Sequence, residues 1–283
     1  MRKLSKKILS LYAKKAIIGL ASVAMVATMS LSTINVSPVK GATTSSTLVW
    51  SDEFNGNSID ASKWGFEIGT GSNGWGNNEQ QYYTNRTDNA YVADGALHIR
   101  AKKEAYGGKN YTSARLNTNG KFTFTYGYVE ARLALPSSQG IWPAFWMLGA
   151  NYATDVWPKC GEIDIMENVG YDPDTIVGSS HTEKYNHAIG TQKNAKIACT
   201  DCYKAFHVYA LEWEEDEYRL YVDDQLYFTF KNEGTGYEVW PYDKRFHILL
   251  NLAIGGNWGG QKGIDDSLFP HVFEIDYVRV YKK

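Results

Sequence analysis

The sequence predicts an all-β protein, a two-sheet antiparallel β-jelly-roll sandwich, and three observations lead to this prediction. Apolar and polar residues alternate over many short segments, which is the period-two pattern of half-buried strands. The 3.6-residue period of amphipathic helices is nearly absent, so a doubly wound α/β fold has no helices to build from. Turns rich in Gly, Asn and Asp separate the segments at short intervals, as in sandwiches and barrels.

The alternation is clearest in seven segments. They cover residues 96–101, 127–135, 208–213, 218–222, 226–230, 247–252 and 273–281. Acidic turns at 214–217 and 223–224 separate the three segments between 208 and 230, which predicts a meander. The Gly-rich stretches 69–76 and 255–263 are expected to be loops within one domain, because strands resume on both sides of each.

The N-terminal segment has the pattern of a secretory signal peptide. Basic residues gather between Arg2 and Lys15, an apolar run covers about 16–31, and small residues lead to a cleavage point near 41/42. Ser and Thr interrupt the apolar run, which is short for a bilayer span. We therefore expect a secreted protein with no membrane association after cleavage. The expected organisation is a signal peptide (1–41), a short lead (42–48) and one domain (49–283).

Composition narrows the class of ligand. The formal net charge is -2, so electrostatics do not favour binding to nucleic acid. The chain has 9 Trp and 20 Tyr, more than a core needs, and flat rings with a polar edge suit the faces of sugars. The alternative is that these rings fill a thick sandwich core.

Three cysteines occur in this chain. Cys199 and Cys202 are close enough in sequence to form a small-loop disulfide, which would leave Cys160 without a partner. A zinc site would need two further ligands, and no partner pair stands at the usual spacing. Neither reading gives these cysteines a role in the chemistry.

The segment "CGEIDIMENVG" (160–170) begins as a strand and then breaks its rhythm. Glu162 and Asp164 share one side, and strict alternation would place the next acid at 166, but Met166 stands there and Glu167 follows. A β-bulge inserts one residue into a strand. If Met166 is absorbed in a bulge, Glu167 returns to the face of the other two acids, and the segment carries three carboxylates on one side.

Such crowding is costly, because neighbouring carboxylates raise one another's pKa. It is useful where one acid must stay protonated beside an ionised one, which is the division of labour in glycoside hydrolysis. On a flat strand the outer acids would be roughly 13 Å apart, at about 3.3 Å per residue, whereas a retaining mechanism needs carboxyl groups about 5–5.5 Å apart. The hypothesis therefore predicts a curved sheet with a cleft on its concave face.

Two other interpretations of the acidic segment are a solvated face and a metal site. Ile163 and Ile165 argue against an open surface and are expected to fill the core behind the acids. No His lies within the segment to indicate a transition-metal site.

Further candidate residues surround this segment in the sequence. Trp142 and Trp146 in "GIWPAFWML" are four apart, so both fall on one face of an extended segment and favour a cleft wall. The other candidates are Arg115 in "SARLNT", Asn78 with Glu79 in "GNNEQQYYT", His181 in "SSHT" and Trp258 in "GGNWGG".

These motifs together resemble a known family. "GEIDIMENVG" after "GIWPAFWML" closely resembles glycoside hydrolase family 16 in its bulged form. The wider set, "WSDEFNG", "NNEQQYYT", "SARLNT", "FHVYALEWEEDEYRLYVDD" and "FEIDYVRVY", is similar to bacterial laminarinases, the endo-β-1,3-glucanases, and spans Val49 to Lys283. The resemblance implies a β-jelly roll with an open cleft on its concave sheet and a retaining mechanism.

The resemblance also assigns roles that the residues alone leave open. It implies that Glu162 is the nucleophile, that Glu167 is the acid/base, and that Asp164 between them tunes their ionisation. His181 is implied as a neighbour of the acid. The implied glucose-binding residues are Trp142, Trp146, Trp258, Arg115 and Asn78.

The resemblance further implies a structural calcium on the convex side, although catalysis needs no cofactor. The matching positions are Glu53 and Gly95 through backbone oxygens and Asp276 through its side chain, and oxygen ligands suit calcium.

The expected partner is a β-glucan polysaccharide, and the expected substrate is laminarin-like β-1,3-glucan. The protein is expected to be a monomer. Mixed-linkage β-1,3-1,4-glucan stays open as a second substrate, since galactan, carrageenan and xyloglucan specificities share the acidic motif within the family. The alternative from another class is a non-catalytic, lectin-like jelly roll that binds sugar in the same cleft.

Overall fold

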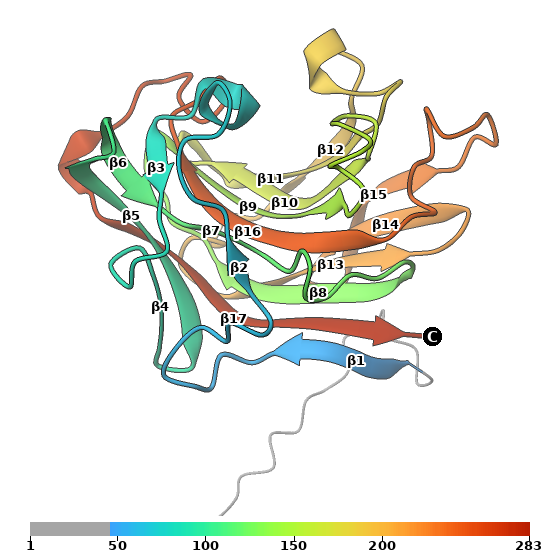
Figure 1. The fold of residues 1–283 in the computed structure, drawn as a ribbon, viewed down its shortest axis with the longest axis horizontal. Helices are drawn as coiled ribbons and strands as arrows, with labels where there is room; N and C mark the ends of the chain where they lie inside the picture. Colours follow the sequence, from blue (N-terminus) through green and yellow to red (C-terminus); the bar gives the residue numbers. More distant parts are fainter. Residues whose placement is uncertain (1–45) are drawn as a thin grey trace, which may run out of the picture. The chain divides into compact units, whose positions relative to one another are not determined.

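The structure is a computed structural model that describes residues 46–283; the predicted signal peptide and most of the short lead lie outside the described residues. The described part forms a ten-stranded and a seven-stranded sheet (Figure 1), which confirms the all-β, two-sheet fold. Strand pairs are antiparallel apart from β3 with β6. Among residues 46–283, no helical segment has the length and hydropathy of a membrane span.

The larger sheet has the order β15-β14-β13-β8-β17-β5-β6-β3, with β1 paired to β17 and β4 paired to β5. Its strands are β1 (Thr47–Asp52), β3 (Gln81–Tyr83), β4 (Ala90–Ala93), β5 (Ala96–Tyr106), β6 (Lys109–Ser113), β8 (Gly127–Ala134), β13 (His207–Trp213), β14 (Glu217–Val222), β15 (Gln225–Lys231) and β17 (His271–Lys282).

The smaller sheet has the order β12-β11-β10-β9-β16-β7-β2. Its strands are β2 (Gly65–Phe66), β7 (Arg115–Asn117), β9 (Ile141–Gly149), β10 (Glu162–Val169), β11 (Asp172–His181), β12 (Lys193–Ala198) and β16 (Phe246–Ile254). Three short helical turns complete the described elements: η1 (Gly74–Asn78), η2 (His187–Ile189) and η3 (Asp266–Leu268).

All seven predicted strands are present, as β5, β8, β13, β14, β15, β16 and β17. The predicted meander is also confirmed, because β13, β14 and β15 are sequential neighbours in the larger sheet. Strand β9 is buried at every position except Trp142, and β11 is buried from Ile176 to His181, since one face packs on the core and the other lies under the cleft. Such two-sided burial weakens alternation, which explains why β9 and β11 were not among the predicted segments.

The core lies between the two sheets. Ile163 and Ile165 of β10 are fully buried there, as predicted, together with Met166. Many aromatic residues are also core residues, and one ring cluster comprises Tyr218, Phe228, Phe230, Trp240 and Tyr242. The aromatic excess therefore has two causes, because other rings line the cleft described below.

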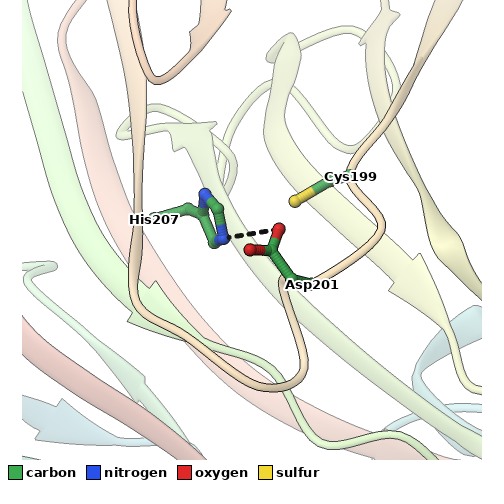
Figure 2. A group of neighbouring side chains, drawn as sticks. All are labelled: Cys199, Asp201 and His207. Carbon is green, nitrogen blue, oxygen red and sulfur yellow. Dashed lines mark ion pairs between the residues drawn. The ribbon is translucent and has the colours of Figure 1, made fainter.

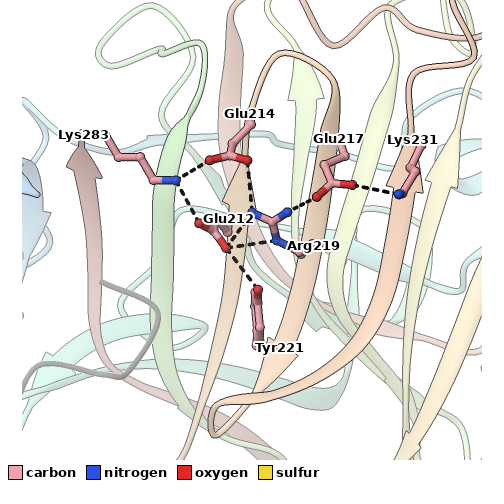
Figure 3. Close-up of polar contacts among 7 residues, drawn as sticks. All are labelled: Glu212, Glu214, Glu217, Arg219, Tyr221, Lys231 and Lys283. Atoms are coloured by element: carbon pink, nitrogen blue, oxygen red, sulfur yellow. Dashed lines mark hydrogen bonds and ion pairs between the residues drawn. The ribbon is translucent and has the colours of Figure 1, made fainter. Parts of the chain in front are cut away.

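A charge network on the larger sheet ties the end of the chain to β13 and β14 (Figure 3). Arg219 of β14 lies 3.0 Å from Glu212 and 3.1 Å from Glu214, and it also pairs with Glu217. Lys283 lies 3.0 Å from Glu212 and pairs with Glu214 as well. The pKa values of Glu212 and Glu214 are lowered, because hydrogen bonds from Lys283 and Arg219 outweigh the effect of burial.

All three cysteines are free thiols in the structure. The small-loop disulfide considered for Cys199 and Cys202 is therefore not formed. Instead the Cys202 thiol donates to the backbone carbonyl of Cys199 at 3.0 Å, so its sulfur is directed toward the main chain.

Candidate active site

A β-bulge in β10 brings the three predicted acids onto one face. On both sides of β10, the pairing register shifts by one residue between Asp164 and Glu167, so β10 carries one extra residue there. The paired positions on β9 are Trp146 with Asp164, Phe145 with Met166, and Ala144 with Glu167. The bulge confirms the explanation of the broken alternation, since the extra residue returns Glu167 to the side of the other acids.

A tyrosine from the opposite sheet supports this bulge. The Tyr227 hydroxyl of β15 donates to the backbone carbonyl of Ile165 at 2.6 Å, which gives the displaced carbonyl a partner. Gly178 of β11 leaves the room for this contact, because a Cβ at that position would lie 2.4 Å from the Tyr227 hydroxyl oxygen. The geometry of the acidic strand thus depends on a contact between the two sheets.

The three acids lie in an open cavity of about 610 Å³. Strands β9, β10, β11 and β16 contribute its floor, η1 and the loop 257–261 contribute one side, and Trp157, His187 and β12 contribute the other. Figure 1 shows η1 (teal) and η2 (yellow) above the same face of the seven-stranded sheet, toward its two ends. A cleft over the acidic strand was predicted, and the structure confirms it.

Each acid has a defined neighbour. The Trp142 indole nitrogen donates to Glu167 Oε1 at 2.9 Å. His181 Nε2 lies 3.2 Å from Asp164 Oδ2 and 3.7 Å from Glu162 Oε1. His181 was expected beside the acid Glu167, but the register of β11 places it opposite Glu162, so it contacts the other two carboxylates instead.

The electrostatics favour protonation of all three acids. Burial, followed by the charge of Asp164, raises the pKa of Glu162 to about 8, although His181 and Arg115 oppose the shift. Burial also raises the pKa of Asp164, and it raises that of Glu167 further above its usual range, with Asp164 adding to the effect. The raised pKa values keep protons within this group of acids, which is the property that general acid catalysis by one of them needs.

Two tryptophans stand beside Glu167. Trp142 and Trp258 meet edge to face with ring centroids 5.3 Å apart, and both line the cavity. The loop carrying Trp258 packs closely on Trp142, because a Cβ at Gly259 would lie 2.9 Å from the Trp142 Cβ. The predicted pairing of aromatic residues with the acidic strand is therefore present, and their rings form one wall of the cleft.

Arg115 and Trp146 form a second group on the cavity wall. The Arg115 guanidinium lies over the rings of both Trp75 and Trp146, with its carbon 4.6 and 4.8 Å from their centroids, and it pairs with Glu67. The Trp146 indole nitrogen donates to Asn251 Oδ1 at 2.8 Å. These contacts fix the orientation of groups that face the cavity.

Asn78 is the one predicted sugar-binding residue outside the cavity lining, although its neighbours Asn77 and Glu79 belong to it. The Asn78 side chain donates to Asn257 Oδ1 at 2.9 Å. It therefore connects η1 to the loop of Trp258 through Asn257, which lines the cavity.

Sequence reasoning missed several cavity residues. Trp157 lies in an irregular segment that gives no periodic signal, and Trp75 stands in a turn that had been taken only as a loop. Asn251 had a signal that was not used, since it is the single amide in the apolar run "HILLNLAI". The missed polar residues of the lining are Asn77, Ser179, His187, Gln192, Asn194, Lys196, Asn251, Asn257 and Gln261.

The predicted calcium positions lie on or next to strands of the larger sheet. Strand β17 pairs Ile275 with Leu97 of β5 and Val278 with Asp52 of β1, so the adjoining positions Gly95 and Glu53 approach β17 near Asp276. The Asp276 carboxylate accepts from Arg132 Nη1 at 2.6 Å. The Glu53 carboxylate accepts from Arg279 at 2.7 Å.

Comparison with known proteins agrees with this geometry. Residues 77–279 match the model of the glycosyl hydrolases family 16. A β-glucanase of Rhodothermus marinus is 49% identical over 244 residues, which cover 83% of this chain and 85% of the relative. The solved structure of the laminarinase from Rhodothermus marinus superposes with a TM-score of 0.81 at 48% identity, covering 84% of this chain and 97% of that one.

A second relative is longer than this chain. The glucan endo-1,3-β-glucosidase A1 of Niallia circulans is 36% identical over 268 residues, and the match covers 87% of this chain but 39% of the relative. The matched region is thus one part of that larger protein.

The fold and the carboxylate cleft define a glycoside hydrolase. The chain belongs to glycoside hydrolase family 16, as the family model and the relatives show. This membership decides against the non-catalytic, lectin-like alternative.

Proposed function

We propose that the protein is a secreted, retaining endo-β-1,3-glucanase that hydrolyses internal bonds of laminarin-like glucans. The observation that carries this proposal is the bulged strand β10, which directs Glu162, Asp164 and Glu167 into one cleft. The names of the relatives support the substrate class, since they include a β-glucanase, a laminarinase and a glucan endo-1,3-β-glucosidase.

The surroundings of the two outer acids support their roles. Trp157 donates a hydrogen bond to Glu162, and His181 and Arg115 oppose the rise of the Glu162 pKa. Glu162 is therefore suited to attack the anomeric carbon and form a glycosyl-enzyme. Glu167 has the more strongly raised pKa and is suited to protonate the leaving oxygen.

The second half of the reaction reverses the proton transfer. After the leaving group departs, Glu167 is ionised and takes a proton from the incoming water, which releases the sugar from Glu162. Asp164 lies between the outer acids, within hydrogen-bonding reach of Glu162 and 3.2 Å from His181. It is suited to hold or release a proton as the charge on the nucleophile changes.

The aromatic wall supports a sugar-binding role for Trp142 and Trp258. Their rings line the cavity beside Glu167, and sugar faces stack on flat apolar rings. The Trp142 nitrogen also orients the acid, so a sugar bound against this wall is placed next to the proton donor. Trp146 and Arg115 are proposed to contact sugars farther along the cleft.

The experiment that tests the reaction measures reducing-end release from laminarin, mixed-linkage β-glucan and cellulose. We expect release from laminarin by the wild-type protein and none by Glu162→Gln, which keeps the shape of the side chain. Release from mixed-linkage glucan would extend the substrate range. Binding of laminarin without release from any of the three polysaccharides would refute the proposal.

We also propose that Glu53, Gly95 and Asp276 hold a structural calcium ion. The pairing of Asp52 with Val278 and of Leu97 with Ile275 supports this proposal, because Glu53 and Gly95 follow or precede these positions by one or two residues, and a hard cation prefers oxygen ligands. Arg132 pairs with Asp276 and would share this carboxylate with the ion. We expect a chelator to lower the melting temperature of the wild-type protein but not of Asp276→Asn. Equal shifts in both proteins would contradict the site.

The proposal of secretion rests on the N-terminal sequence pattern. Basic residues, an apolar run and small residues precede position 42. We expect N-terminal sequencing of the exported protein to begin near Ala42, and size-exclusion chromatography to give a monomer. An N-terminus at Met1 in the exported protein would contradict the predicted cleavage.

A further inference from the structure

A cluster of metal-ligating side chains lies outside the cleft, where the chain passes from one sheet to the other. Cys199 follows β12 at the edge of the smaller sheet, Asp201 lies in the connecting turn, and His207 begins β13 in the larger sheet. Figure 2 shows that the three side chains point toward one another. Their ligating atoms all lie within 4.8 Å of one another.

The ring of His207 is held in a defined orientation. Its Nδ1 contacts the carboxylate of Asp223, and the same carboxylate accepts from the backbone nitrogen of Val208 at 2.8 Å. A carboxylate on one ring nitrogen is the arrangement that orients a metal-binding histidine and presents the other nitrogen to the metal.

The other ring nitrogen has no hydrogen bond although it is buried. Nε2 of His207 lies 3.2 Å from Asp201 Oδ1, but the geometry is not that of a hydrogen bond. In the neutral ring with its Nδ1 proton directed at Asp223, the Nε2 lone pair faces a carboxylate oxygen of Asp201, so a proton or a metal ion is needed between these two acceptors. A cation bound between them would satisfy both acceptors.

Cys199 supplies the third donor. Its side chain is 6% exposed and stands on the buried side of the cluster, whereas Asp201 is exposed and leaves an entry from solvent. The Cys202 thiol contacts the backbone carbonyls of Cys199 at 3.0 Å and Pro173 at 3.4 Å and also hydrogen-bonds the Cys199 thiol, so it is a neighbour of the proposed ligand and not itself a ligand.

We propose that Cys199, Asp201 and His207 bind one zinc-type divalent ion, with water in the fourth position. Thiolate, imidazole and carboxylate are the three ligand types of zinc, and thiolate disfavours calcium and magnesium. Binding releases the thiol proton of Cys199 to solvent. The spacing Cys-x-Asp-x5-His differs from that of zinc fingers, which is why the sequence did not reveal the site.

The ion would clamp the connection between the two sheets, because one ligand follows β12 and another begins β13. This position is separate from the carboxylate cleft, whose lining includes none of the three residues. The site is therefore structural, and its loss is expected to leave the cleft chemistry intact.

The test uses the whole mature chain, reduced and freed of metal, with zinc or cobalt as the probe. We expect one equivalent of zinc by elemental analysis and a thiolate-to-cobalt charge-transfer band in the near ultraviolet. Cys199→Ala, His207→Gln and Asp201→Asn should each remove stoichiometric binding. Cys160→Ala, which removes a buried thiol elsewhere, should bind as the wild type does. Asp223→Asn should weaken binding by about 10–100-fold, since it orients the ring.

Asp201→Asn keeps the proposal falsifiable if the buried variants fail to fold, because the Asp201 side chain is 57% exposed. Laminarin hydrolysis reports the fold of each variant. Zinc binding by the three ligand variants at wild-type affinity would overturn the proposal. Failure of the reduced wild-type protein to bind zinc would overturn it as well, including the case in which Cys199 and Cys202 form a disulfide instead.

Discussion

Two groups of carboxylates in this protein behave in opposite ways. On the larger sheet, Glu212 and Glu214 have lowered pKa values. In the cleft, Glu162 and Glu167 have raised pKa values. Both groups crowd acids within a few residues of one strand or turn, so crowding alone does not decide their ionisation.

The difference lies in the partners and in burial. Arg219 and Lys283 reach the acids of the larger sheet within salt-bridge distance. In the cleft, the neighbours of the acids are indole donors, a histidine and the other acids. These acids are also buried, and Asp164 is 3% exposed. Cations in direct contact make the carboxylate cluster of the larger sheet a structural element, whereas burial outweighs the effects of Arg115 and His181 on Glu162 in the cleft and raises its pKa.

The largest expected effect comes from removing the proposed proton donor. Glu167→Gln keeps the hydrogen bond from Trp142 possible but cannot protonate the leaving oxygen, so kcat on laminarin should fall by about 10²–10⁴-fold. Aryl glycosides with acidic leaving groups need little protonation and should lose far less. An equal loss on both substrate types would show that Glu167 acts in some other way.

The next effect concerns the support of the bulge. Tyr227→Phe removes the donor to the Ile165 carbonyl and leaves a buried acceptor unpaired, at a cost of about 1–3 kcal/mol in stability. We expect kcat to fall more than the KM for laminarin changes, because the acids move relative to each other. Tyr221→Phe, on the charge network, is the matched control and should keep its kcat. An unchanged kcat in Tyr227→Phe would show that the geometry of the bulge does not depend on this hydrogen bond.

The raised pKa of Glu162 also makes a prediction about stability. The folded pKa of about 8 lies above the ordinary value of 4.5, so the unfolded chain loses this proton first, and stability falls as pH rises between the two values. Glu162→Gln should therefore raise stability at neutral pH, by about 1–2 kcal/mol. The gain should vanish below the ordinary pKa. Thermal melts from acid to neutral pH would measure it, and a gain independent of pH would contradict the assignment.

The smallest effect is expected on the larger sheet. Arg219→Met should cost up to about 1 kcal/mol, because the network is partly exposed to solvent. The pKa values of Glu212 and Glu214 are lowered in the folded state, so this stabilisation is present above their ordinary pKa and is lost as pH falls through the folded values. The difference from wild type should shrink in acid, and laminarin hydrolysis should stay unchanged. A loss of activity would show that the two groups are coupled.

The features that the sequence predicted correctly are those that depend on local patterns of residues. The seven alternating strands, the bulge at Met166 and the buried Ile163 and Ile165 all follow from period-two reasoning. Contacts between distant segments could not be predicted in this way. Tyr227 reaches the bulge from β15, and Trp157 reaches the cleft from an irregular segment. His207 meets Cys199 only through the crossover between the sheets, and His181 was displaced from its expected neighbour by strand register.

The stereochemistry of the released sugar tests the central claim most directly. If Glu162 and Glu167 act as nucleophile and acid/base, the new reducing end forms by double displacement and keeps the β configuration. Proton NMR during the first minutes of laminarin hydrolysis would show which anomer appears before mutarotation. We predict the β-anomer first. An initial α-anomer would mean direct attack by water, and the assignment of Glu162 as the nucleophile would be wrong.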